Sequence, residues 1–146
     1  MDKELKREII IDNYQNPFNK GLVEDGSYMR ENGSSDNCID NLDFMVKVDG
    51  GIVKDIRFDG EACAISTSAA SIIIRLLIGK SVEEAKKLLN NYQNMINEKE
   101  YDEKLLEELV VYDEVGKQPN RKNCVLLPSR VILELLNKLN GWYMWK

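Results

Sequence analysis

Hydrophobic residues at alternate positions predict a β-hairpin near the middle of the chain. They recur in this way along residues 44–48 and again along 52–58, a pattern typical of strands that bury one face. The intervening Asp49-Gly50-Gly51 has the residue types of a tight hairpin turn. We therefore predict two antiparallel strands joined by this turn.

Hydrophobic residues spaced three or four apart predict helices on both sides of the hairpin. Asn16-Pro17 and Gly79 are helix-ending signals, and Ser81 with Glu84 forms a capping box that begins a helix. Pro128 is expected in the opening turn of the last helix, where its missing N–H needs no partner. The expected helices span residues 3–14, 66–78, about 82–97, 102–112 and about 125–139.

The segment from residue 17 to residue 41 is rich in Gly, Asn, Ser and Asp and is predicted to be a long loop. A loop of this length within a compact domain usually has a function or is partly mobile. A hairpin followed by helices predicts an α+β fold, a small antiparallel sheet packed against several helices. The chain of 146 residues fits one domain, 1–146.

Composition narrows the chemistry that this chain can perform. Acidic residues outnumber basic ones, 25 to 20, for a net charge of −5, which disfavours nucleic acid as a partner. The chain has no histidine and therefore no histidine-activated nucleophile and no imidazole metal ligand. Without such a base, Ser66, Ser68 and Ser71 are expected to permit close helix packing rather than to act as nucleophiles.

The sequence also predicts a compartment. The N-terminal region has mixed charges and only a short apolar run, Ile9-Ile10-Ile11, which is no signal-peptide core. The longest apolar stretch, 72–78, is interrupted by Arg75 and is too short to span a membrane. We therefore expect a cytoplasmic protein without a membrane segment, in a compartment where thiols stay reduced.

The three cysteines all lie at junctions between expected elements. Cys38 precedes the first strand, Cys63 follows the hairpin, and Cys124 precedes the last helix. A helix N-terminus favours the thiolate form, which is both a metal ligand and a nucleophile, and Asp40 lies within loop reach of Cys38. The spacing is not that of a common zinc finger, so buried and inert cysteines remain the alternative at this point.

Five segments, taken in chain order, carry a more specific signal. Together they resemble the U-type scaffold family of iron–sulfur cluster biogenesis, and within it the SufU branch. The long interval between Cys63 and Cys124 favours that branch, as does Asn123, which occupies the position where the IscU branch has a histidine. The segments are Asn16-Pro17-Phe18-Asn19-Lys20-Gly21, Cys38-Ile39-Asp40, Phe58-Asp59-Gly60-Glu61-Ala62-Cys63-Ala64-Ile65-Ser66, Gly79-Lys80-Ser81-Val82-Glu83-Glu84-Ala85 and Pro119-Asn120-Arg121-Lys122-Asn123-Cys124.

The resemblance implies a metal site and a sulfur relay. The implied ligands are Cys38, Asp40, Cys63 and Cys124, which would hold zinc in tetrahedral geometry, with a [2Fe–2S] cluster as the alternative. Cys38 is implied as the thiolate that accepts a persulfide sulfur, with Cys124 as the other candidate. Arg121 is implied to pair with Asp40 or a thiolate and so to tune the site.

The function that follows from the resemblance is sulfur transfer for iron–sulfur cluster biogenesis. The implied donor is a SufS-like cysteine desulfurase dependent on pyridoxal phosphate, and the recipients are iron–sulfur apo-proteins or assembly components. The chain would be a zinc-dependent, sulfurtransferase-like acceptor rather than an independent enzyme. The alternatives are a scaffold on which a [2Fe–2S] cluster is assembled and a structural zinc-binding adaptor without sulfur chemistry.

Overall fold

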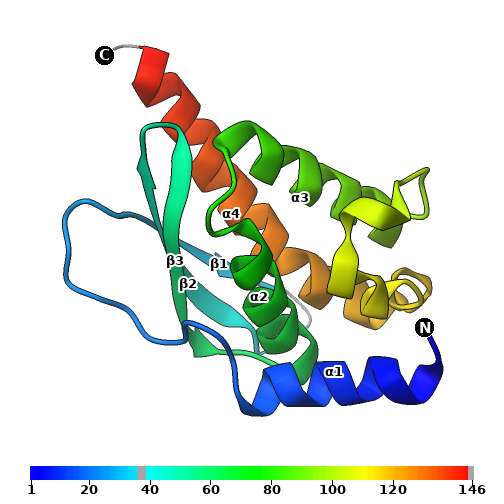
Figure 1. The fold of residues 1–146 in the computed structure, drawn as a ribbon. Coiled ribbons are helices and arrows are strands. Elements are labelled where there is room, and N and C mark those ends of the chain that lie inside the picture. The colour runs from blue at the N-terminus through cyan, green and yellow to red at the C-terminus, as the bar shows by residue number, and fades with distance from the viewer. Residues whose placement is uncertain (36–38, 145–146) are drawn as a thin grey trace.

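A computed structural model describes the backbone of residues 1–35 and 39–144, and the side chains within these ranges up to residue 139. The predicted α+β class is confirmed, since a three-stranded antiparallel sheet packs against helices. Figure 1 shows the strands on one side of the molecule and the helices on the other. No helix in the described part of the chain is long and apolar enough to cross a membrane.

The predicted hairpin forms the larger part of the sheet. Strands β2 (Asn41–Asp49) and β3 (Ile52–Glu61) pair antiparallel, with Phe44 opposite Phe58. These two rings are fully buried and lie 6.0 Å apart. The turn has Gly50 and Gly51 at positive φ, 59° and 76°, which glycine adopts without steric cost.

The third strand lies inside the segment that was predicted to be loop. Strand β1 (Met29–Ser34) pairs antiparallel with β2 at the edge of the sheet. Its sequence, Met-Arg-Glu-Asn-Gly-Ser, lacks the hydrophobic alternation that marks a strand. Pairing with β2 and packing against the last helix hold it in place instead, and a Cβ at Gly33 would overlap Val131.

The helices follow the predicted order, with two differences in the second half. The predicted helix 102–112 is a series of short 3₁₀ turns, interrupted at Glu107, whose φ is +48°. The last helix begins at Pro119, before the expected start, because proline is well suited to a first helical position. The helices are α1 (Lys3–Gln15), α2 (Ala64–Leu77), α3 (Val82–Ile96) and α4 (Pro119–Met144), and the 3₁₀ turns are η1 (Glu103–Leu105), η2 (Glu107–Tyr112) and η3 (Val115–Lys117).

Helix α2 is the centre of the core and contacts α1, α4 and β3. The predicted packing role of its serines is confirmed, because all three are fully buried. Ser71 donates to Asn13 Oδ1 at 2.8 Å, and Ser68 Oγ lies 2.6 Å from the Tyr112 hydroxyl. Burial raises the pKa of Tyr112, so this hydroxyl keeps its proton at neutral pH.

Candidate metal centre

Two hairpin strands and two helices bring three of the predicted site residues together. Asp40 directly precedes β2, and Cys63 follows β3 at the N-cap of α2. Because Asn41 pairs with Glu61, the two chain ends that carry Asp40 and Cys63 leave the sheet at the same edge. Cys124 comes from α4, which packs against α2.

The ligand atoms of these three residues form one compact group. The carboxylate of Asp40 and the two sulfur atoms of Cys63 and Cys124 all lie within 4.8 Å of one another. Asp40 and Cys124 are almost completely buried, at 2% and 1% exposure, and Cys63 is partly buried. Burial of a carboxylate is costly unless hydrogen bonds or a cation compensate it, so this arrangement requires specific partners.

Hydrogen bonds hold both carboxylate oxygens of Asp40. The backbone N–H of Cys63 donates to Oδ1 at 2.8 Å, and the Ser66 hydroxyl donates to Oδ2 at 2.5 Å. Oδ2 also lies 3.8 Å from the Cys63 sulfur. Ser66 was predicted only to permit helix packing, although its position three residues after Cys63, on the first turn of α2, could have placed it at the site.

Cys124 occupies a different position from the one predicted. It lies in the second turn of α4 and not before the helix, so the predicted position at a helix N-terminus is wrong. Pro128 likewise lies well inside α4 and not in its opening turn. The Ser66 hydroxyl, 2.7 Å away, is the side-chain donor to the carbonyl oxygen of Cys124.

The remaining predicted site residues are Cys38 and Arg121. Cys38 lies outside the described residues. Ile39, the first described residue after Cys38, is 71% exposed. The side chain of Arg121 is exposed, forms no ion pair with Asp40 and lines an open pocket together with Ile65 and Arg7.

The donor set fits a zinc ion. Zinc takes thiolate sulfur at about 2.3 Å and carboxylate oxygen at about 2.0 Å, so the two atoms lie roughly 3.5 Å apart around a tetrahedral ion. The distance of 3.8 Å between the Cys63 sulfur and Asp40 Oδ2 is close to that value. Asp40, Cys63 and Cys124 therefore form a group that could hold a metal ion.

This fold and this buried Asp–Cys–Cys group define a small α+β domain with a candidate metal centre between its sheet and its helices. Residues 5–125 match the family described as the NifU-like N-terminal domain, and the chain belongs to that family. The family resemblance predicted from the five sequence segments is confirmed.

Two curated relatives and one solved structure show the same similarity. The zinc-dependent sulfurtransferase SufU of Bacillus subtilis is 33% identical over 138 residues, which are 94% of this chain and 92% of that protein. The iron–sulfur cluster assembly scaffold protein IscU of Thermotoga maritima is 29% identical over 94% of this chain and 96% of that protein. A SUF-system scaffold protein of Fervidobacterium islandicum superposes with a TM-score of 0.78 at 29% identity, covering 88% of this chain and 94% of that chain.

Proposed function

We propose that this protein accepts sulfur, as a persulfide, from a cysteine desulfurase and passes it into iron–sulfur cluster assembly. The observation that carries the proposal is the Asp40–Cys63–Cys124 group, with all ligand atoms within 4.8 Å of one another. The similarity to a protein named a zinc-dependent sulfurtransferase over 94% of the chain supports it. A SufS-like desulfurase would be the donor, and assembly components or apo-proteins the recipients.

The proposed zinc ligands are Cys38, Asp40, Cys63 and Cys124. Three thiolates and one carboxylate are a chemically suitable set for a closed zinc site. Bound zinc would keep the cysteine sulfurs deprotonated at neutral pH and therefore nucleophilic. The protein's own part is to hold Asp40 and Cys63 from the sheet edge beside Cys124 from α4.

In the proposed transfer, a thiolate of this chain attacks the terminal sulfur of the desulfurase persulfide. A new S–S bond forms on the acceptor, the S–S bond within the donor persulfide breaks, and the donor cysteine leaves as a thiolate, so no external oxidant is needed. We propose Cys38 as the acceptor, because Cys124 is only 1% exposed and a partner's persulfide cannot reach it directly. The exposed Arg121 guanidinium is available to attract the anionic persulfide or an acidic group of the partner.

The proposal is tested by incubating the purified chain with a desulfurase and cysteine and measuring the mass of its cysteine peptides. We expect one added sulfur atom in wild type, carried by Cys38, and none in Cys38→Ser. Reactions without cysteine are the control. If no cysteine of the wild-type chain gains sulfur, the proposed function is wrong. If Cys38→Ser stays folded and still stimulates desulfurase turnover, the chain has a role without this sulfur transfer, as in a zinc adaptor.

A cluster scaffold is the second candidate, favoured by the similarity to a protein named IscU over 94% of the chain. Metal analysis of protein purified without added metal separates the two functions. Zinc near one per chain supports the sulfur acceptor, whereas iron with acid-labile sulfide supports the scaffold. Anaerobic reconstitution with iron and sulfide, followed by visible absorption, provides the second measurement.

A further inference from the structure

We infer that Ser66 is a positioning residue of the metal centre, which joins the Asp40 carboxylate to the backbone of Cys124. The inference rests on the proposed function, because it assigns a role toward the metal of that same site. Its basis is the position of one hydroxyl group among all three described members of the site.

The Ser66 hydroxyl lies at the middle of the group and is fully buried. Its oxygen is 2.5 Å from Asp40 Oδ2, 3.7 Å from the Cys63 sulfur and 2.7 Å from the Cys124 carbonyl oxygen. A serine hydroxyl has a single proton to donate. The carboxylate and the carbonyl are both acceptors, so the one O–H is shared between them as a three-centre hydrogen bond.

Pro128 explains why the Cys124 carbonyl needs this donor. In an α-helix the N–H of a residue bonds to the carbonyl four positions earlier, so residue 128 would serve Cys124. Proline has no N–H, and its ring crowds that same carbonyl. Ser66 of α2 supplies the missing hydrogen bond from outside α4.

The same hydroxyl fixes the orientation of Asp40. Rotation of the carboxylate is limited because Cys63 N–H holds Oδ1 and Ser66 holds Oδ2. Oδ2 lies 3.8 Å from the Cys63 sulfur, so the Ser66 hydrogen bond holds it where a metal bound to that sulfur could also contact it. Ser66 thus sets the position of one ligand and the helix segment that carries another.

Zinc affinity, measured by competition with a chromophoric chelator, tests the inference. We expect Ser66→Ala to bind Zn²⁺ about 10–100-fold more weakly than wild type, the usual cost of removing a partner of a metal ligand. Ser71→Ala is the matched control, because it also removes a fully buried hydroxyl from α2, where the partners are Asn13 and Phe18. Its Zn²⁺ affinity should equal that of wild type.

Ser66→Ala is also measured in a Pro128→Ala background, which controls for misfolding. Pro128→Ala restores a backbone N–H for the Cys124 carbonyl, so this carbonyl has a hydrogen-bond donor within α4 when Ser66 is replaced. The affinity loss should persist there, because Asp40 still lacks its donor. Equal affinity with and without the Ser66 hydroxyl, in a folded protein of either background, would overturn the inference. If wild type itself binds no Zn²⁺, the proposed zinc site fails first, and this inference fails with it.

Discussion

Gly60 controls how closely the ends of β2 and β3 approach, and therefore where Asp40 and Cys63 lie. It pairs with Leu42 and has a φ of +131°, a backbone conformation that residues with a side chain rarely adopt. A Cβ at this position would overlap the carbonyl oxygen of Asn41, which is a backbone atom and cannot rotate away. Only glycine fits here without moving the strand that leads into the site.

Gly60→Ala should therefore destabilise the fold more than the comparable change in the hairpin turn. Gly50→Ala is the matched control, since Gly50 also has positive φ, +59°, but its added Cβ would meet nothing within 4 Å. The left-handed backbone alone costs about 1–2 kcal/mol for alanine, and the overlap at residue 60 adds to that cost. Urea unfolding of the two variants measures the difference, and equal losses would contradict this interpretation of Gly60.

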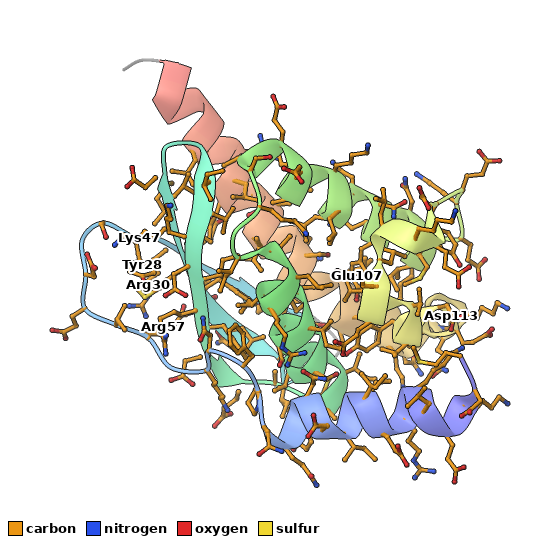
Figure 2. The ribbon with its side chains drawn as sticks, viewed as in Figure 1. Tyr28, Arg30, Lys47, Arg57, Glu107 and Asp113 are labelled. Carbon is orange, nitrogen blue, oxygen red and sulfur yellow. The ribbon has the colours of Figure 1, made fainter. Side chains whose placement is uncertain are left out.

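A hydrogen bond and a ring contact of Tyr28 hold the segment between α1 and β1 against the outer face of the sheet. Its hydroxyl donates to Asp55 Oδ2 at 2.5 Å, and its ring lies 5.9 Å from Lys47 Nζ. Figure 2 shows Tyr28, Lys47 and Arg57 together on this side of the strands. Burial, followed by the hydrogen bond to Asp55, raises the pKa of Tyr28 to about 12.

This raised pKa predicts a loss of stability at high pH. The folded protein holds the phenol proton more tightly than the unfolded chain, so the contribution is complete below the ordinary tyrosine pKa of about 10 and declines as the pH rises through about 12. Tyr28→Phe should remove this part of the decline and cost about 1 kcal/mol at neutral pH for the lost hydrogen bond. Denaturant unfolding of wild type and Tyr28→Phe between neutral and alkaline pH measures both effects. Parallel pH profiles would be the contrary result.

At the scale of elements, β1 is held to α4 by an ion pair as well as by packing. Lys138 Nζ lies 2.6 Å from Glu31 Oε1. Their hydrogen bond lowers the pKa of Glu31 and raises that of Lys138. Glu134 of α4 also faces this pair and contributes to both shifts. The pair joins the strand next to the candidate site with the helix that provides Cys124.

A fall in pH should weaken the ion pair between Glu31 and Lys138. Because the folded pKa of Glu31 is lowered, its contribution is present above the unfolded value of about 4.3 and is lost as the pH falls through the folded value. Glu31→Gln should show a smaller loss of stability than wild type over that acidic range. The pair is partly exposed, so high salt should reduce the difference between the two proteins. Thermal unfolding across the pH range, at low and high salt, measures both effects, and a difference unaffected by salt would contradict the ion-pair explanation.

The sequence predicts elements well where local signals act and less well where partners from elsewhere decide. The β2–β3 hairpin and the helix start at Ser81 depend on neighbouring residues, and both form as predicted. At Ser81 the side-chain hydroxyl is the N-cap and accepts from Glu84 N–H at 3.1 Å. Strand β1 has no such signal and exists because β2 and α4 flank it. The prediction that Pro128 lies in the opening turn of the last helix was wrong for a related reason. The Ser66 hydroxyl, which donates to the Cys124 carbonyl in place of the missing proline N–H, belongs to a different helix.

At the scale of the whole molecule, the candidate site joins elements that are far apart in sequence. Asp40 directly precedes β2, Cys63 is the N-cap residue of α2, and Cys124 lies in α4. No spacing rule connects these positions, so only the family resemblance predicts them as a set. Their juxtaposition depends on hairpin register and on α2–α4 packing, which no short motif encodes. The contacts of Ser66 with the site were not predicted, because its partners Asp40 and Cys124 lie 26 and 58 positions away in the chain.

A metal bound at this junction should stabilise the fold as a unit, because the sheet edge, α2 and α4 would all be linked through it. A ligand that binds only the folded state at a hundredfold excess over its Kd adds about 2.7 kcal/mol. For a chain of this size that corresponds to a rise in Tm of roughly 5–11 °C. Wild type with Zn²⁺ should therefore melt at a higher temperature than the same protein after chelation, and re-addition of Zn²⁺ should restore the difference.

Asp40→Asn provides the comparison that assigns this stabilisation to the site. The variant keeps an oxygen and nearly the same shape but loses the charge that favours a divalent cation, so its response to Zn²⁺ should be much smaller than that of wild type. Asp43→Asn is the matched control, because Asp43 lies on β2 close by in sequence and pairs with Arg30 at the surface. Its Tm should rise with Zn²⁺ as in wild type. A rise of equal size in Asp40→Asn would show that the metal stabilises the protein from another position, and the Asp40, Cys63 and Cys124 side chains would then owe their proximity to packing alone.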